Sequence, residues 1–178
     1  MAPLVVELNY WLALGGIALA LATAYLLIEH FLLRGERVLT PYVRRFGLWA
    51  VLLVALASVV LTLVYSEVFG FVPCGLCWLQ RIFLYPLPLV MAVALWHRTR
   101  EKVVADIGIA LSSLGAVVAL YQHYLQMGGS ELVTCPTAGA GTDCAQRILF
   151  EFGFVTFPLL SAIVFVFVIA VLLVWRKG

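Results

Sequence analysis

The chain has 178 residues, of which 65% are hydrophobic and 11% are charged, and its mean hydropathy is +1.11. Soluble domains are roughly 45–50% apolar and about 25% charged, so this composition excludes soluble enzymes. The formal net charge of +2 is too balanced to indicate a nucleic-acid partner. The length suits one compact domain, and the composition predicts an integral membrane protein in contact with lipid.

Continuous apolar stretches predict the elements in chain order. They cover residues 8–33, 48–66, 79–96, 104–126 and 154–175. Each has about 18 residues or more, enough for a helix to cross a hydrocarbon core of about 30 Å. Helices satisfy their own backbone groups in lipid, and the alternation typical of barrel strands is absent from these stretches. We therefore predict an all-α membrane bundle, with a kink at Pro86 and Pro88.

The first stretch has an alternative interpretation as a cleaved signal peptide, because small residues gather at 20–24. No basic segment precedes it, however, and the apolar run continues to Leu33. Both features favour a spanning helix over a signal peptide.

Basic residues predict the orientation of the bundle. Nine of the 11 lie between stretches one and two, between three and four, or after five: Arg34, Arg37, Arg44, Arg45, Arg98, Arg100, Lys102, Arg176 and Lys177. This side is predicted to be cytoplasmic, together with the C-terminus. The N-terminus and two loops, at 67–78 and 127–153, are then external.

All four cysteines fall in the two external loops, Cys74 and Cys77 in the first and Cys135 and Cys144 in the second. Disulfides persist in an oxidising external space, so we expect two external cysteine pairs, although four cysteines allow three pairings. The short segment between Cys135 and Cys144 is also compatible with a structural staple. The C-x-x-C of the first loop is more typical of redox chemistry.

Cys77 is predicted to lie in or next to the first turn of the third helix, where the helix dipole stabilises a thiolate. Arg81 follows one turn later on the same face. A charge at the membrane edge indicates function, and the alternative is an arginine that snorkels to lipid headgroups.

Disulfide exchange must deliver its electrons to an acceptor. The chain has no nucleotide-binding motif and no loop large enough for a flavin, so we expect a lipid-soluble acceptor, and a quinone fits. The predicted electron path runs from an external dithiol protein to Cys135–Cys144, then to Cys74–Cys77 and the quinone.

The run from Pro73 to Ile82, PCGLCWLQRI, followed by Tyr85 and Pro86, resembles the disulfide bond formation protein B (DsbB) family, especially its BdbC-like branch. The resemblance covers about residues 48–175. It implies a four-helix redox domain at 48–178, preceded at 1–47 by an extra transmembrane helix and a cytoplasmic loop.

The resemblance also implies an activity: a multi-pass thiol–quinone oxidoreductase of a prokaryotic cell membrane that makes disulfides de novo. Its partner would be an external, DsbA-like thioredoxin-fold protein, and its cofactor ubiquinone or menaquinone. By this resemblance, Cys74 and Cys77 match the pair re-oxidised by quinone, with Cys77 as the sulfur at the quinone ring and Arg81 as the arginine beside it. Cys135 matches the sulfur attacked by the partner, and Cys144 matches its companion. His123 and Gln126 match a His/Gln pair near the quinone.

Three other functions remain as alternatives. A vitamin K epoxide reductase-like enzyme also couples thiols to quinones, but there the C-x-x-C follows the loop pair, whereas here it precedes it. A zinc site made of the four cysteines is a second alternative, and a structural subunit with static disulfides is a third. For residues 146–152 we expect either a short amphipathic helix on the outer leaflet or a simple lead into the fifth helix.

Overall fold

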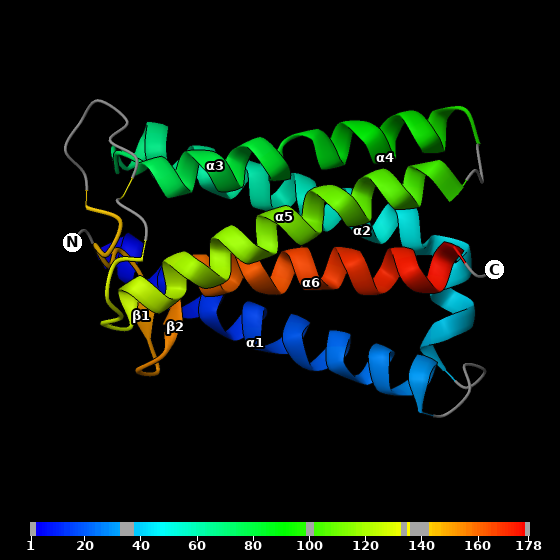
Figure 1. Cartoon of the computed structure of the whole chain (residues 1–178), viewed down its shortest axis with the longest axis horizontal. Coiled ribbons are helices and arrows are strands. Elements are labelled where there is room, and N and C mark those ends of the chain that lie inside the picture. The colour runs from blue at the N-terminus through cyan, green and yellow to red at the C-terminus, as the bar shows by residue number, and fades with distance from the viewer. Residues whose placement is uncertain (1–2, 33–37, 99–101, 133–134, 136–142, 177–178) are drawn as a thin grey trace.

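The computed structural model describes residues 3–32, 38–98, 102–132, 135 and 143–176. In this part of the chain, helical segments long and apolar enough to cross a membrane cover Pro3–Phe31, Leu39–Val68, Gly75–Trp96, Lys102–Gln126 and Phe157–Arg176. They run side by side along the long axis of the molecule (Figure 1). The predicted helical membrane bundle is confirmed, and the protein is a multi-pass membrane protein.

Two of the five segments are not uniform α-helices. Helix α2 (Leu39–Leu63) continues into a π-helical turn, η1 (Val64–Val68). The third segment consists of α3 (Gly75–Leu84) and α4 (Pro86–Trp96), because the ring of Pro86 removes a backbone donor and interrupts the helix, as the sequence predicts. Helix α3 begins at Gly75 rather than at residue 79, so it includes part of the C-x-x-C.

The main core lies between α2, α4, α5 (Lys102–Gln126) and α6 (Phe157–Arg176), around the fully buried Leu87, Met91 and Phe165. Helices α5 and α6 pack closely because α5 carries small residues. A Cβ added at Gly115 would lie 2.3 Å from Cζ of Phe165. Small residues are the usual means by which membrane helices approach one another, since lipid provides no hydrophobic driving force between them.

Helix α1 (Pro3–Phe31) lies against α6 and is fixed near both ends (Figure 1). Near its C-terminal end, the fully buried Glu29 accepts the backbone N–H groups of Val38, Leu39 and Thr40, each at 3.0 Å. These are orphan donors at the start of α2, which a carboxylate satisfies well. Near its N-terminal end, Asn9 accepts the hydroxyl of Tyr65 on η1 at 2.5 Å.

Residues just before α6 form a small hairpin. Strand β1 (Phe150–Glu151) pairs antiparallel with β2 (Val155–Thr156). The turn uses positive φ angles at Phe152 (53°) and Gly153 (78°), which a right-handed helix does not allow. The amphipathic helix considered for residues 146–152 is therefore wrong, because the turn directs the chain back into a β-pair.

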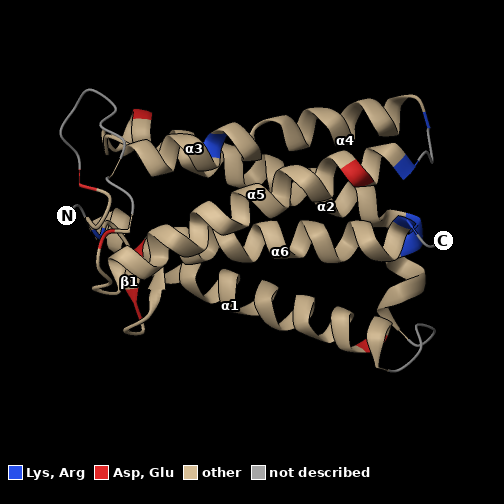
Figure 2. Cartoon of the chain, viewed as in Figure 1, with Lys and Arg blue, Asp and Glu red and all other residues tan. Residues whose placement is uncertain are grey.

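Charged residues are distributed unevenly along the bundle. Figure 2 shows lysine and arginine gathered at the end where α4, α5 and the C-terminus meet. Arg98, Lys102 and Arg176 lie at this end, and Arg176 pairs with Asp106 at 2.5 Å. The predicted cytoplasmic residues Arg34, Arg37, Arg100 and Lys177 lie outside the described residues. The cysteine-bearing segments lie at the opposite end.

Candidate active site

The C-x-x-C forms the beginning of α3. Cys74 is the N-cap residue, and its sulfur accepts the backbone N–H of Cys77 at 3.4 Å. Cys77 lies in the first turn, as the sequence predicts. The two sulfur atoms are 3.0 Å apart without a bond between them, so the pair is present as a dithiol.

The two thiols differ in their surroundings. Cys74 is 5% exposed, whereas Cys77 is only half-buried. The hydrogen bond between the sulfurs, and then burial, raise the pKa of the Cys74 thiol above its ordinary value. Cys74 therefore keeps its proton when the pair first ionises, and Cys77 is the sulfur that carries the negative charge.

Gln122 on α5 joins the two cysteines to a neighbouring amide. Its Nε2 donates to the sulfur of Cys74 at 3.1 Å and to that of Cys77 at 3.3 Å. Its Oε1 accepts from Nε2 of Gln80 at 2.5 Å, and only 1% of Gln122 is exposed. The sequence patterns described above do not indicate this residue. The feature that could have indicated it is a polar side chain inside a membrane span, one turn before Gln126 on the same helix face.

Cys135 and Cys144 form a disulfide, which selects one of the three possible pairings. Cys144 is fully buried and belongs to the same cluster as Cys74, and the half-buried Cys135 packs against it. Nε2 of Gln122 also donates to the carbonyl of Cys144 at 3.4 Å. Both cysteine pairs therefore meet around Gln122. Of the segment that the disulfide encloses, residues 136–142 lie outside the described part of the chain.

Arg81 points into the bundle. It is 9% exposed, its Nη2 donates to the carbonyl of Thr62 at 2.9 Å, and its guanidinium lies 5.1 Å from the ring centre of Trp78. Thr62 lies at the end of α2, where the α-helix continues into the π-helical turn η1, and such turns are frequent at functional sites. A snorkelling arginine would be exposed to headgroups, whereas Arg81 is buried within the bundle.

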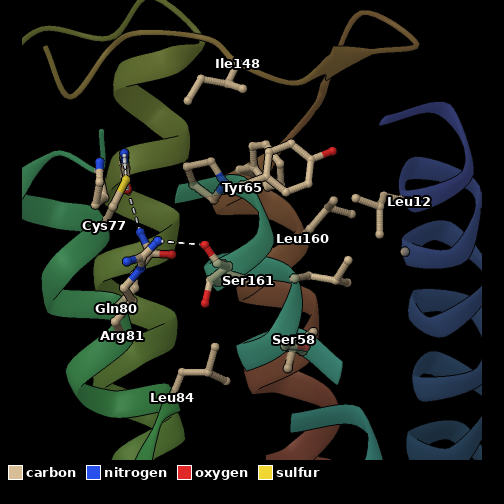
Figure 3. Close-up of a pocket in the computed structure, with 18 of the residues that line it drawn as sticks. Leu12, Ser58, Tyr65, Cys77, Gln80, Arg81, Leu84, Ile148, Leu160 and Ser161 are labelled. Atoms are coloured by element: carbon tan, nitrogen blue, oxygen red, sulfur yellow. Dashed lines mark hydrogen bonds between the residues drawn. The ribbon is translucent and has the colours of Figure 1, made fainter. Parts of the chain in front are cut away.

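A cavity of about 360 Å³ opens beside Cys77 and Arg81. Figure 3 shows Cys77, Gln80 and Arg81 on one side of it, with Tyr65, Leu160 and Ser161 across from them. Gln126 also lines the cavity, and it is 5% exposed. Its Nε2 donates to the carbonyl of Gln146 at 2.8 Å, while its buried Oε1 has no partner among the described residues.

The structure therefore brings most of the expected site residues together. The cavity is lined by Cys74, Cys77, Arg81 and Gln126, and the Cys135–Cys144 disulfide packs beside it. His123 is not part of its lining, because its Nδ1 lies 2.8 Å from Oγ1 of Thr156, next to the hairpin. One residue along a helix turns a side chain by about 100°, which separates His123 from the sulfurs that Gln122 contacts.

The described residues contain no group of three or more metal-ligating side chains. Two of the four cysteines are joined in a disulfide, and a disulfide sulfur has no thiolate to offer a zinc ion. The zinc alternative would require a different redox state of this site.

Comparison with known proteins places the chain in a family. The family model described as disulfide bond formation protein DsbB matches residues 44–175. The chain is 35% identical to the SPbeta prophage-derived disulfide bond formation protein B of Bacillus subtilis, over 74% of this chain and 86% of the relative. It is also 35% identical to disulfide bond formation protein C of the same organism, over 70% of this chain and 86% of the relative.

A more distant relative, a probable disulfide formation protein of Chlamydia caviae, is 32% identical over 70% of this chain and 87% of its own length. No solved structure matches the chain significantly. The family match includes α3, α4 and α5 with all four cysteines, most of α2 and nearly all of α6, and it leaves α1 outside. The chain thus belongs to the disulfide bond formation protein B family and is a disulfide oxidoreductase of the membrane.

Proposed function

We propose that the protein is a thiol–quinone oxidoreductase that oxidises an external thioredoxin-fold dithiol protein and transfers the electrons to a membrane quinone. The single observation that carries the proposal is the meeting of both cysteine pairs at Gln122, directly beside a cavity that also contains Arg81. A static staple needs neither a dithiol at a helix start nor a buried cation beside it.

The cavity residues fit a quinone. Its volume of about 360 Å³ lies in the range of small-molecule sites. Arg81 offers a positive charge to an oxygen, and the unpartnered Oε1 of Gln126 offers an acceptor for an O–H group. A bound quinone supplies a sink for two electrons and two protons. Cys77, which is less buried than Cys74 and contacts the cavity, is the sulfur that would face it.

Exchange with the partner begins at the loop disulfide. A partner thiolate attacks the sulfur of Cys135, the bond from Cys135 to Cys144 breaks, and the sulfur of Cys144 takes the electron pair. The partner's second thiol then displaces Cys135, which leaves an oxidised partner and a reduced loop pair. Cys135 is the accessible sulfur for this attack, since Cys144 is fully buried.

The loop pair is then re-oxidised by the C-x-x-C. A thiolate of the reduced loop attacks the Cys74–Cys77 disulfide, whose bond breaks as a mixed disulfide forms between the loop and the C-x-x-C. The second loop thiol then displaces the C-x-x-C sulfur, which re-forms the Cys135–Cys144 disulfide and leaves both electrons on Cys74 and Cys77 as thiols.

The distribution of charge supports an external position for this chemistry. The end of the bundle rich in lysine and arginine is cytoplasmic by the positive-inside rule, so the opposite end, with all four cysteines, faces the external or periplasmic side (Figure 2). We place the protein in a prokaryotic cell membrane, with an external N-terminus and a cytoplasmic C-terminus.

The test is anaerobic quinone reduction by the purified protein, with a reduced thioredoxin-fold protein as the electron donor. Cys77→Ser is expected to abolish quinone reduction with any donor. Cys135→Ser is expected to abolish the reaction with the protein donor and to retain it with dithiothreitol. Arg81→Ala is expected to raise the KM for quinone more than the KM for the partner.

The alternatives predict different results. A zinc protein would contain stoichiometric metal and reduce no quinone, and a structural subunit would keep its cysteines oxidised with any donor. A Cys135→Ser variant that oxidises the partner at the full rate would contradict the proposed order of the two pairs.

A further inference from the structure

Helix α1 forms one wall of the cavity, although it lies outside the residues that match the family. It contributes residues from a single helix face, which lie one, three or four positions apart: Trp11, Leu12, Gly15, Gly16 and Leu19. Figure 3 shows Leu12 facing the cavity from α1, on the far side from Cys77.

The wall is held in place by polar contacts that a loosely attached helix would lack. Asn9 is 3% exposed, accepts from the hydroxyl of Tyr65, and donates from Nδ2 to the carbonyl of Ile148 at 3.3 Å. Glu29 binds the start of α2 at the other end of the membrane. Buried hydrogen bonds of this kind fix the position of a helix, because breaking them leaves polar atoms unsatisfied.

The cavity is polar at one end and mostly apolar at the other. The polar end consists of the sulfurs together with Gln80, Arg81, Gln122 and Gln126. The other end is made mainly by apolar residues of α1 and α6 such as Leu160, although Ser58 and Ser161 also line the cavity there (Figure 3). The Oε1 atom of Gln126 is buried and has no hydrogen-bond partner among the described residues, so the polar end offers an unused acceptor to a ligand. Such a lining suits a molecule with a polar head and an apolar tail.

The two adjacent glycines on α1, Gly15 and Gly16, have different surroundings. A Cβ at Gly16 would lie 2.2 Å from Cδ2 of Leu160, so this glycine permits the close approach of α1 to α6. A Cβ at Gly15 would meet nothing within 4 Å. Gly15 is therefore not required for helix packing, and its missing side chain leaves open space along the cavity wall.

We infer that α1 is a substrate-selecting wall, and that Gly15 and Leu12 form the contact surface for the apolar tail of the quinone whose head lies at Cys77 and Arg81. The inference rests on the proposed function, and it adds a determinant of tail recognition from a helix outside the family match. A phospholipid acyl chain is the other apolar occupant that this end of the cavity admits.

The experiment compares two quinones that share a head group, decylubiquinone and the corresponding benzoquinone without a tail. The measured quantity is the ratio of their KM values, tailed over tail-less, with dithiothreitol as the donor. Gly15→Leu is expected to raise this ratio about tenfold, the factor for roughly two tail methylenes that lose their burial. Leu12→Ala, which adds no bulk, is expected to raise the ratio in the same direction by removing tail contacts.

The matched control is Ala18→Leu, which adds the same side chain to an exposed position of α1 that does not line the cavity. It is expected to keep the wild-type ratio. A Gly15→Leu ratio equal to that of Ala18→Leu overturns the inference while the proposed function stands. The same holds if Gly15→Leu only releases a co-purifying phospholipid and leaves the ratio unchanged.

A binding measurement separates the inference from the proposed activity. The dissociation constant for decylubiquinone is measured in a Cys74→Ser/Cys77→Ser background, in which no turnover occurs. If the wild type reduces neither quinone, the proposed function fails, and weaker binding in Gly15→Leu but not in Ala18→Leu still supports the α1 wall. Equal binding in these two variants overturns it.

Discussion

Gln122→Leu isolates the most specific contact of the site. Leucine has a similar size, but it cannot donate to the sulfurs of Cys74 and Cys77, which lie 3.1 and 3.3 Å from Nε2 of Gln122. A hydrogen bond to a charged group contributes about 1.5–3 kcal/mol. At 1.36 kcal/mol per factor of ten, its loss lowers the ionisation constant of the pair about tenfold to a hundredfold.

The assay is the rate of alkylation by iodoacetamide across a pH series under reducing conditions, with the Cys77 peptide quantified by mass spectrometry. Only the thiolate reacts, so at acidic pH, where the pair is mostly protonated, we expect the rate to fall at least about tenfold in Gln122→Leu. Gln126→Leu is the matched control, because Gln126 lies one turn away on α5 and donates to the carbonyl of Gln146 instead of to sulfur. It is expected to keep the wild-type alkylation rate.

Stability provides a second readout of the same substitution. Gln122→Leu also removes the acceptor of Gln80, and an unsatisfied buried amide costs about 1–3 kcal/mol. Adding Gln80→Leu is expected to restore part of the stability without restoring the alkylation rate. Equal alkylation rates in Gln122→Leu and the wild type would refute the argument that Gln122 stabilises the ionised pair.

Three further substitutions test the fold, each read out by thermal unfolding in detergent. Tyr65→Phe removes the donor to Asn9 and is expected to cost about 1–3 kcal/mol, because the amide oxygen remains buried without it. Glu29→Gln replaces a carboxylate that accepts three N–H groups and is expected to cost about 2 kcal/mol. Gly115→Ala brings a methyl group against the ring of Phe165 and is expected to cost about 1–3 kcal/mol, with partial rescue by Phe165→Leu.

Each of these substitutions has a control in the same chain. Tyr42→Phe removes a hydroxyl from an exposed tyrosine, and Glu7→Gln neutralises an exposed carboxylate. Gly15→Ala adds its methyl group to open space, and alanine favours the helix, so this control is expected to raise stability by up to about 1 kcal/mol. The other two controls are expected to change stability by less than about 0.5 kcal/mol. A control that destabilises as much as its partner variant would contradict the assigned contact.

Local patterns in the sequence predicted the part of the site that lies within one element. Cys74, Cys77 and Arg81 follow each other on a single helix, so their spacing alone places them on neighbouring turns. The structure adds the sulfur–sulfur contact and the partner of Arg81, the carbonyl of Thr62 on α2. That partner depends on how α2 packs against α3, which no local spacing encodes.

Choosing between adjacent polar residues on α5 required the tertiary structure. His123 was expected near the quinone, yet it contacts Thr156, while its neighbour Gln122 reaches the sulfurs. Which face of α5 points to α3 is decided by interhelical packing, including the close contact of Gly115 with Phe165. The hairpin at residues 150–156 was missed for a similar reason, since its turn relies on a positive φ at Phe152 as well as at Gly153.

The sequence by itself determined the membrane-spanning segments, the separation of charge along the bundle and the redox character of the C-x-x-C, because hydropathy, charge and short-range spacing are properties of the linear chain. Tertiary packing decided that both cysteine pairs meet at Gln122, that Arg81 is buried, and that α1 forms a wall of the cavity. These contacts join residues far apart in the chain, and they exist only once the helices have fixed their rotation and depth against one another.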